Sequence, residues 1–245
     1  MIRTNSIQLD GAVAKQLLSE LLTGKYKDAY RLPPELDIAK DMGVSRTALR
    51  DGISILEREG FVTRKWGLGT LINHHVLGVK TRIDIEEEFL ETIRRAGYTA
   101  SLGDTIAEKC IADQRDADKL RIEINSPVIR IHRIAYADKI PAIYCTDTFS
   151  ADLIKNNDFP DSELNKPIFG FLTKYCETDV FIDLTEIHAV NADTSIAGKL
   201  KIKEGTAVLF LDEVGYDYQG NPILHSDEYY HEGIITYTTL RNKIG

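Results

Sequence analysis

Cysteine is scarce in this chain of 245 residues, where Cys110, Cys145 and Cys176 are scattered along the sequence. An odd number of cysteines without metal-ligand spacing gives no disulfide framework, so we expect reduced thiols and no metal site built from them. Long apolar runs are also absent, because no stretch reaches the roughly 20 residues that cross a bilayer. A charged-then-apolar leader is missing as well. These absences predict a cytoplasmic protein that does not enter the membrane.

The acidic charge of the chain is unevenly distributed. The formal net charge is −8, yet residues 1–75 carry 11 Lys and Arg against 9 Asp and Glu. Residues 76–245 carry 19 against 29. The slightly positive segment can lie close to the phosphates of a nucleic acid, whereas the acidic remainder would repel them. We therefore expect a segment that contacts nucleic acid, joined to an acidic part with a different task.

Two short helices joined by a tight turn are predicted in the N-terminal third of the chain. The first spans 35–42 and ends at Gly43, because the residue after the last helical turn is often left-handed. Ser45 supplies an N-cap oxygen for the second helix, 46–59. A preceding helix over 11–23 carries an apolar stripe and completes a three-helix core. Together these elements predict a helix-turn-helix.

A glycine-tipped hairpin, or wing, follows the second helix. Its strands are predicted at 61–64 and 70–72, joined across Lys-Trp-Gly-Leu-Gly. Glycine lets backbone amides approach phosphates or a minor groove closely. Arg46 and Arg50 lie away from the apolar stripe, where arginine pairs with guanine edges in a major groove. The alternative, a helical hairpin inside a larger core, is disfavoured by the wing, the capping serine and the paired arginines. The predicted DNA contacts are Ser45, Arg46, Thr47, Arg50, Arg64, Lys65, Gly67, Gly69 and Thr70.

A series of short motifs runs through this segment. They are Leu32-Pro33-x-Glu35, Gly43-Val44-Ser45-Arg46, Arg50, Leu56-Glu57, Glu59-Gly60 and Gly67-x-Gly69-Thr70. Over roughly residues 8–74 the chain resembles GntR-family bacterial transcription regulators. The resemblance implies operator binding through the two arginines and the wing. Leu36 and Leu68 depart from it, because the family commonly has arginine at both positions, so some of its DNA contacts are expected to be missing.

The domain boundary is predicted at a solvated linker over residues 75–84. A winged helix-turn-helix DNA-binding domain precedes it at 1–74, and an effector-binding and dimerisation domain follows at 85–245. The neighbouring His74 and His75 suggest a metal site, but adjacent residues share neither a helix face nor a strand face. We therefore favour the linker over the metal site.

The second half of the chain predicts strands broken by turns, with helices between them. Strands are predicted at 106–112, 127–136, 142–149, 179–190, 207–218, 223–231 and 235–240, which are rich in β-branched and aromatic residues. Helices are predicted at 85–96, 116–120, 168–175 and 194–200, and no internal repeat is apparent. Hairpin links between the strands favour an α+β domain built on an antiparallel sheet. The acidic runs 86–88 and 227–228 are expected to be solvated.

A second, weaker set of motifs follows in a consistent order. It comprises 128–133, 138–141, Ala197-x-x-Leu200, Gly205-x-Ala-Val208-Leu209, Gly220-Asn-Pro222 and Tyr229-Tyr230. Over about residues 85–243 the chain resembles the ligand-sensing (UTRA) domain of HutC-type GntR regulators. This resemblance implies a chorismate-lyase-like fold. It also implies a homodimeric repressor whose C-terminal domain dimerises and binds a small metabolite.

The resemblance argues against a phosphosugar as that metabolite. Phosphosugar-sensing relatives hold the phosphate with two arginines two residues apart, whereas this chain has Arg133 and Ala135. Further sugar and phosphate contacts of those relatives fall at Cys145, Leu224, Pro167 and Phe169, while Tyr230 is retained. An anion needs helix amides and several donors, so we predict a smaller or less anionic effector. The candidate contacts are His132, Arg133, Tyr144, Asp147, Glu186 and Tyr230, each of which could serve a structural pair instead.

Three classes of function stay open. The first is a ligand-responsive transcription regulator, in which the effector favours one arrangement of two heads and so changes their fit to operator half-sites. The second is a chorismate-lyase-like enzyme with an appended DNA-binding head, although the sequence shows no nucleophile–base pair, metal motif or phosphate loop. The third is a ligand-independent DNA-binding dimer. We expect no cofactor and no catalytic residue.

Overall fold

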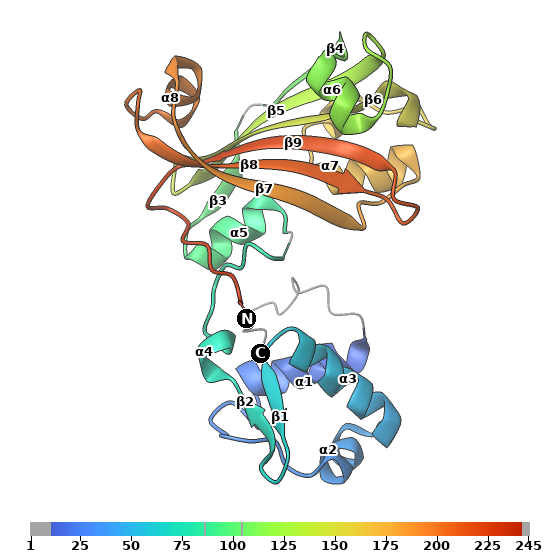
Figure 1. Ribbon diagram of the computed structural model, residues 1–245, viewed down its shortest axis with the longest axis vertical. Helices are drawn as coiled ribbons and strands as arrows, with labels where there is room; N and C mark the ends of the chain where they lie inside the picture. Colours follow the sequence, from blue (N-terminus) through green and yellow to red (C-terminus); the bar gives the residue numbers. More distant parts are fainter. Residues whose placement is uncertain (1–10, 86, 104, 242–245) are drawn as a thin grey trace. The chain divides into compact units, whose positions relative to one another are not determined.

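The computed structural model describes residues 11–85, 87–103 and 105–241 and divides into two compact units (Figure 1). The first unit, here called the head, comprises Met1–Ile85 and Tyr237–Gly245. The second, called the body, comprises Glu86–Thr236. This division differs from the predicted one in two respects, because the residues predicted as a linker and the end of the chain both belong to the head.

The head is a three-helix core with a wing, which confirms the predicted helix-turn-helix. Its elements are α1 (Ala12–Leu22), α2 (Glu35–Met42), α3 (Arg46–Arg58), β1 (Val62–Lys65), β2 (Gly69–Ile72) and α4 (His74–Leu77). Leu49, Ile53 and Leu56 recur at helical spacing on α3, and all three are fully buried. They pack with side chains of α1 and α2 in one apolar cluster. The core therefore fixes which face of α3 points outward.

The turn between α2 and α3 has the predicted chemistry. Gly43 adopts a left-handed conformation with φ of 68°, which costs a residue without Cβ no strain. The Ser45 hydroxyl accepts a hydrogen bond from the Ala48 backbone N–H at 3.1 Å. This cap defines the first turn of α3 and leaves its outward side chains unobstructed.

The end of the chain returns to the head instead of adding a strand to the body. The prediction of a strand over 235–240 is wrong, because Thr238 forms an isolated parallel bridge with Arg82. The Thr238 N–H donates to the Thr81 carbonyl, and the Thr238 carbonyl accepts from the Ile83 N–H, both at 3.0 Å. These residues lie outside the sheet of the body. The backbone of Thr238 pairs instead with residues 81–83 of the head.

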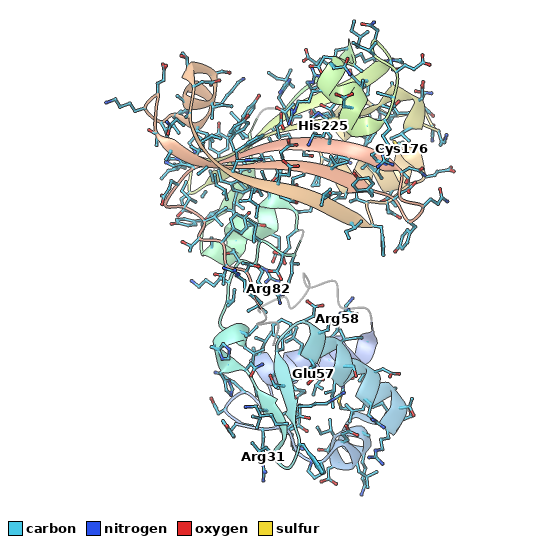
Figure 2. All side chains as sticks on the ribbon, in the orientation of Figure 1. Arg31, Glu57, Arg58, Arg82, Cys176 and His225 are labelled. Carbon is cyan, nitrogen blue, oxygen red and sulfur yellow. The ribbon has the colours of Figure 1, made fainter. Side chains whose placement is uncertain are left out.

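The predicted linker is packed rather than solvated. The guanidinium of Arg82, which is labelled in Figure 2, donates to the Glu59 carbonyl at the end of α3 at 3.0 Å. The Arg82 side chain is 9% exposed and also pairs with Asp84. Leu240 packs against the apolar core of the head. Two separate stretches of chain are thus fixed beside the C-terminal end of α3.

The body is a seven-stranded antiparallel sheet with helices on both faces. Its strands are β3 (Ala100–Leu102), β4 (Ile106–Ile111), β5 (Pro127–Ala137), β6 (Ile140–Ser150), β7 (Ile182–Asn191), β8 (Ala207–Tyr216) and β9 (Pro222–Tyr230). Its helices are α5 (Phe89–Ala96), α6 (Gln114–Leu120), α7 (Ile168–Phe171), which continues as a π-helical turn over Leu172–Cys176, and α8 (Thr194–Leu200). Short 3₁₀ turns lie at Ala151–Leu153 and Asp161–Glu163. The strand order is β3-β5-β6-β9-β8-β7, with β4 also on β5 (Figure 1). This architecture confirms the predicted α+β class.

The sheet contains two copies of one strand–helix–hairpin unit, contrary to the expectation of no internal repeat. The first copy is β4, α6, β5 and β6, and the second is β7, α8, β8 and β9; β6 and β9 pair at the centre. The side chains of Asp113 and Asp193 cap α6 and α8. Equivalent residues are 80 positions apart, as in Asp113/Asp193, Ala117/Ala197, Lys119/Lys199, Leu120/Leu200, Ile122/Ile202 and Val128/Val208. The repeated residues are helix caps and core positions, which are few, so the repeat is difficult to detect in the sequence.

Alternation along the strands gives the sheet two distinct faces. Ile129 and Phe149 point to the face that α7 covers, where Phe171 packs against them. Tyr144 and Val208 point to the other face, under α8. We call these the cavity face and the opposite face.

Candidate DNA-binding surface and effector cavity

The start of α3 presents exposed polar side chains from the head. The side chains of Arg46 and Arg50 are 65% and 61% exposed. Both lie near the Glu35 carboxylate, at 3.5 Å and 3.8 Å. Ser45 and Thr47 are exposed beside them. The predicted contacts of the recognition helix therefore share one solvent-facing surface.

The wing contributes a second exposed segment. Lys65, Gly67 and Gly69 are exposed, and both glycines have positive φ, 77° and 86°. Thr70 is half-buried. Trp66 at the tip is 88% exposed, so an apolar ring stands where the wing would approach a groove. Glycine at these two positions lets the four-residue strands turn without strain.

Arg64, a predicted DNA contact, serves as a brace between the wing and α3. Its guanidinium donates to the Arg50 carbonyl and to the Ser54 hydroxyl, both at 3.0 Å. Its backbone N–H donates to the Glu57 carboxylate at 2.7 Å (Glu57 is labelled in Figure 2). The sequence could not reveal this role, because the contact joins residues 14 positions apart.

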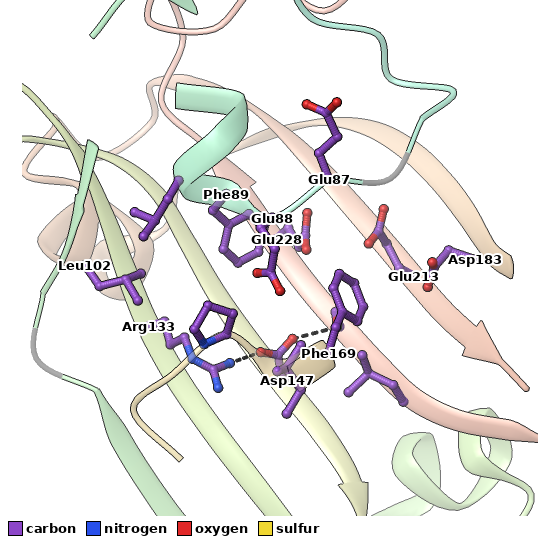
Figure 3. Close-up of a pocket in the computed structure, with 15 residues that line it drawn as sticks. Glu87, Glu88, Phe89, Leu102, Arg133, Asp147, Phe169, Asp183, Glu213 and Glu228 are labelled. Carbon is purple, nitrogen blue, oxygen red and sulfur yellow. Dashed lines mark hydrogen bonds and ion pairs between the residues drawn. The ribbon is translucent and has the colours of Figure 1, made fainter. Parts of the chain in front are cut away.

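A cavity opens on the cavity face of the body, and its space, counted together with the open solvent at its mouth, is about 510 Å³ (Figure 3). Its floor comes from the strands β3, β5, β6, β9, β8 and β7, and its walls come from the start of α5 and from α7. The polar residues that line it are Glu87, Glu88, Arg133, Asp147, Asp183, Glu213, Ser226 and Glu228; the apolar ones are Phe89, Leu90, Leu102, Pro167, Ile168, Phe169 and Leu224. Arg133 is the one basic side chain among the described residues that line it.

A buried polar group ties the strands together beneath the cavity. Arg133 forms an ion pair with Asp147, and both side chains are 3% exposed. The Arg133 guanidinium also donates to the carbonyls of Leu164 and Lys166, at 3.1 Å and 3.0 Å. The Ser226 hydroxyl donates to Asp147 at 2.7 Å. Arg133 Nε is buried and has no hydrogen-bond partner within the described part of the chain.

Burial changes the protonation of several carboxyl groups around the cavity. Desolvation raises the pKa of Glu88 to about 7, with the Arg133 charge opposing the rise. Desolvation likewise raises the pKa of Glu213 to about 7 and that of Asp183 to about 6. Burial also raises the pKa of the Cys145 thiol, so this thiol is not an activated nucleophile. The cavity thus gathers carboxyl groups whose charged forms are incompletely compensated.

The six predicted effector residues separate onto two faces of the sheet. Arg133 and Asp147 line the cavity. Tyr230 lies on the same face, and its hydroxyl donates to the Glu228 carboxylate at 2.5 Å. Ligand contact by these residues stays a prediction.

His132, Tyr144 and Glu186 lie on the opposite face, which corrects their predicted convergence with the other three. His132 Nδ1 is 3.1 Å from the Tyr144 hydroxyl. Glu186 is exposed on β7. The physical reason is strand alternation, because neighbours such as His132 and Arg133 point to opposite sides of a strand.

Most of the acidic lining was not predicted from the sequence. Glu228 was expected in a solvated run, yet it is 5% exposed, and Glu88 belongs to the cavity wall. Glu213 is 5% exposed as well. The internal repeat is the signal that could have found Glu213, because it stands 80 positions after Arg133.

One group in the described part of the chain has the spacing of metal ligands, on the opposite face. The ligand atoms of Asp212, His225 and Asp227 lie within 4.8 Å of one another. Arg115 donates to both oxygens of Asp227, at 2.5 Å and 2.6 Å, and the Lys119 ammonium lies 2.9 Å from Asp212. These two cations already compensate the carboxylates, so we assign no metal to this group.

Comparison with known proteins identifies both units. Residues 97–233 match the UTRA domain, and residues 9–72 match the family described as bacterial regulatory proteins, gntR family. The chain belongs to the GntR family of transcription regulators with a UTRA domain. The described part of this regulator contains no helix long and apolar enough to cross a membrane.

Relatives cover nearly the whole length of the regulator. It is 25% identical over 236 residues to the probable fructoselysine utilization operon transcriptional repressor of Escherichia coli K12, with 94% of this chain and 93% of the relative covered. It is 22% identical to the transcriptional repressor NagR of Bacillus subtilis, with 95% and 94% covered. These relatives are transcription regulators and not enzymes, which excludes the lyase alternative.

Solved structures share the fold. The possible transcriptional regulator YydK of Bacillus subtilis has a TM-score of 0.74 at 15% identity, with 94% of this chain and 99% of that one covered. PhnF of Mycobacterium smegmatis has a TM-score of 0.57 at 19% identity, with 94% and 99% covered. The winged helix-turn-helix head and the chorismate-lyase-like sheet body therefore match the predicted fold class.

Proposed function

We propose that this regulator is a homodimeric repressor of the HutC type, whose head binds operator DNA and whose body binds a small metabolite that releases it. The exposed pair Arg46 and Arg50 at the capped start of α3 is the observation that carries the proposal. A helix presented in this way fits a major groove, where each arginine reads a guanine edge. The named relatives are repressors, which favours repression over activation.

The cavity in the body is the proposed effector site. It is concave and combines apolar side chains of α5 and α7 with converging polar groups from the sheet, and small-molecule sites commonly combine the two in this way. Its lining is acidic, with Arg133 as the one cation among the described lining residues. A phosphate would face these carboxylates, so the composition of the cavity supports the prediction against a phosphosugar.

The edge strand β7 is the proposed dimer interface. Its aliphatic side chains Ile182, Leu184 and Ile187 are 55% to 63% exposed. The exposed rings of Phe181 and Tyr218 stack beside them, with centroids 4.2 Å apart. An edge strand with exposed apolar side chains is a ready template for pairing with a second copy. Two joined bodies would present two heads to a palindromic operator.

The proposal is tested by selecting bound sequences from fragmented genomic DNA with the full-length protein. Titration of the selected site should then give specific binding by a dimer, with two half-sites related by two-fold symmetry. Binding that shows no preference for the selected site over unrelated DNA at the same salt concentration would refute the operator-binding function.

A further inference from the structure

We propose that the body cavity takes a small organic cation, an ammonium- or guanidinium-bearing metabolite that also carries an oxygen acceptor. The inference rests on the effector function proposed above and specifies the chemical class of the effector. It follows from the charges that line the cavity, the internal repeat of the sheet and an unpaired donor of Arg133.

The charge around the cavity is strongly unbalanced. Among the described residues, six carboxylic side chains line it, those of Glu87, Glu88, Asp147, Asp183, Glu213 and Glu228, against the single guanidinium of Arg133. That guanidinium is already paired with Asp147, and the Arg95 guanidinium lies 3.2 Å from Glu87. Like charges gathered in a poorly hydrated site repel one another unless a cation compensates them. Figure 3 shows Asp183 and Glu213 on one side of the cavity, Arg133 on the other, and Glu228 between them.

The first copy of the repeat provides its own cation. Arg133 of β5 lies opposite Cys145 of β6, and Asp147 follows two residues after that partner. Cys145 and Asp147 share the cavity face because they are two residues apart on one strand. Arg133 points to the same face because it lies directly opposite Cys145. An arginine and a carboxylate therefore meet diagonally across this strand pair.

The second copy has a glutamate where the first has its arginine. Glu213 of β8 lies opposite Ser226 of β9, and Glu228 follows two residues after that partner. Glu213 thus stands at the position equivalent to Arg133, and Glu228 at the position equivalent to Asp147. A ligand cation beside Glu213 would restore to the second copy the charge that an arginine side chain gives the first.

Burial of these groups makes a cation favourable at this end of the cavity. Glu213 is 5% exposed and accepts a hydrogen bond from the Thr185 hydroxyl at 2.9 Å. The charges of Asp183, Asp147 and Asp212 all act against its ionisation. An ammonium group placed here would form charge-assisted hydrogen bonds with carboxylates that water reaches poorly.

At the other end of the cavity, a hydrogen-bond donor of Arg133 lacks an acceptor among the described residues, which an oxygen atom of the ligand would supply. Arg133 lines the cavity, is 3% exposed and leaves its Nε–H without an acceptor within residues 11–85, 87–103 and 105–241. A buried donor without a partner is costly and rare in folded proteins. A hydroxyl, carbonyl or carboxylate oxygen of the ligand would satisfy it. The ligand therefore combines a cationic group with an oxygen acceptor, as amino alcohols, amino sugars and basic amino acids do.

Matched pairs of compounds test the charge requirement directly. Thermal unfolding of the full-length protein would be followed at pH 8 with lysine or norleucine, ethanolamine or ethylene glycol, and glucosamine or glucose, each up to tens of millimolar. Glucose 6-phosphate serves as the anion. We expect a concentration-dependent rise in melting temperature for at least one cation and none for its uncharged counterpart. Equal responses within every pair, or no response to any cation, overturns the proposal.

Two isosteric variants locate the effect. Glu213→Gln should weaken binding of the stabilising cation about tenfold or more, because one charged hydrogen bond is lost. Glu186→Gln, on the opposite face of β7, is the matched control and should bind it like wild type. Undiminished affinity in Glu213→Gln places the cation elsewhere and overturns the assignment. Because Gln removes a buried charge, the variant should unfold no earlier than wild type without ligand, which separates lost binding from lost folding.

The outcomes for the effector function and for the ligand class are distinct. Stabilisation by glucose 6-phosphate or by an uncharged compound alone keeps the effector function and refutes the cationic class. Selective cation binding in a protein that fails to recognise any operator keeps the cationic class and refutes the regulator function.

Discussion

At the scale of single residues, Arg46 and Arg50 are exposed and form ion pairs with Glu35, at 3.5 Å and 3.8 Å. We expect both arginines to exchange these ion pairs for contacts with DNA. Exposed ion pairs of this kind contribute little to stability. We expect Arg46→Ala and Arg50→Ala each to weaken operator binding by about 1–3 kcal/mol and to relax selectivity at one base position. Titration of each variant against single-base operator mutants measures both effects. Wild-type affinity in either variant would contradict the placement of α3 in the groove.

Lys65 is the matched comparison within the wing, where it is exposed. A lysine that contacts phosphate gives affinity without sequence information. Lys65→Ala should therefore weaken binding to all sequences alike and reduce the slope of log affinity against log salt by about one. An effect confined to one operator base would contradict a phosphate contact.

Arg64 should differ from Lys65 because its guanidinium is engaged within the head. Arg64→Ala removes hydrogen bonds to the Arg50 carbonyl and the Ser54 hydroxyl, and an ion pair with Glu57 at 3.6 Å. We expect a loss of about 1–2 kcal/mol in the unfolding free energy of the head. Chemical denaturation in the absence of DNA checks this, with Lys65→Ala expected to unfold like wild type. Equal stability of both variants would show that the brace contributes nothing.

Glu88 and Glu213 give the ligand-free protein a distinctive pH dependence. Burial raises the pKa of each to about 7, above the ordinary value of 4.5. The folded state therefore holds protons that the unfolded state has released. The contribution of these two groups to the free energy of unfolding is fully present below about pH 4.5, and it is lost as the pH rises through about 7.

The melting temperature without ligand should consequently fall between pH 6 and pH 8, and Glu213→Gln should flatten that fall. Glu186→Gln, which changes an exposed carboxylate, should leave it as in wild type. A wild-type slope in Glu213→Gln would show that this carboxyl titrates normally. The same protonation predicts that a cation binds more tightly at pH 8 than at pH 6, because the charged carboxylate is its partner.

At the scale of elements, β7 is an edge strand of the sheet, and its exposed apolar side chains favour contact with a second copy of the chain. Leu184 is 63% exposed, and a lysine there would place charge at the centre of the proposed interface. We expect Leu184→Lys to shift the full-length protein from dimer to monomer in sedimentation velocity. Ile106→Lys on β4, at the other end of the sheet and 55% exposed, should remain dimeric. The reverse pattern would assign the interface to β4.

The elements of the head could be predicted from sequence because their signals are local. Gly43 ends α2, Ser45 caps α3, and the spacing of Leu49, Ile53 and Leu56 fixes its buried face. A wing tipped by glycine needs no distant residue to define it. These features act within a few positions of each other, so a single sequence suffices.

The candidate effector site resisted prediction because it depends on register between distant strands. His132 and Arg133 are neighbours in sequence but point to opposite faces, and only the pairing with β6 decides which one reaches the cavity. Glu213 and Asp147 come from strands far apart in the chain and share one face through Ser226. The strand expected at 235–240 failed for a related reason, because its composition could not show that it pairs with residues near Arg82 in the head.

At the scale of the whole molecule, the head is tied to the body by two stretches of chain. The residues before α5 and those after β9 both run into the head, where Arg82 and Thr238 pair beside the end of α3. We therefore propose that a ligand that favours one arrangement of the body acts on α3 through these two connections. Linkage then requires that ligand and operator change each other's affinity by the same factor.

An operator-binding titration of the full-length protein, with and without the most stabilising cation, decides whether the cavity controls DNA binding. We expect saturating cation to weaken operator affinity about fivefold or more in the wild type and in Glu186→Gln, but not in Glu213→Gln at the same concentration. Operator affinity unchanged by a cation that demonstrably occupies the cavity would contradict control of DNA binding by this site.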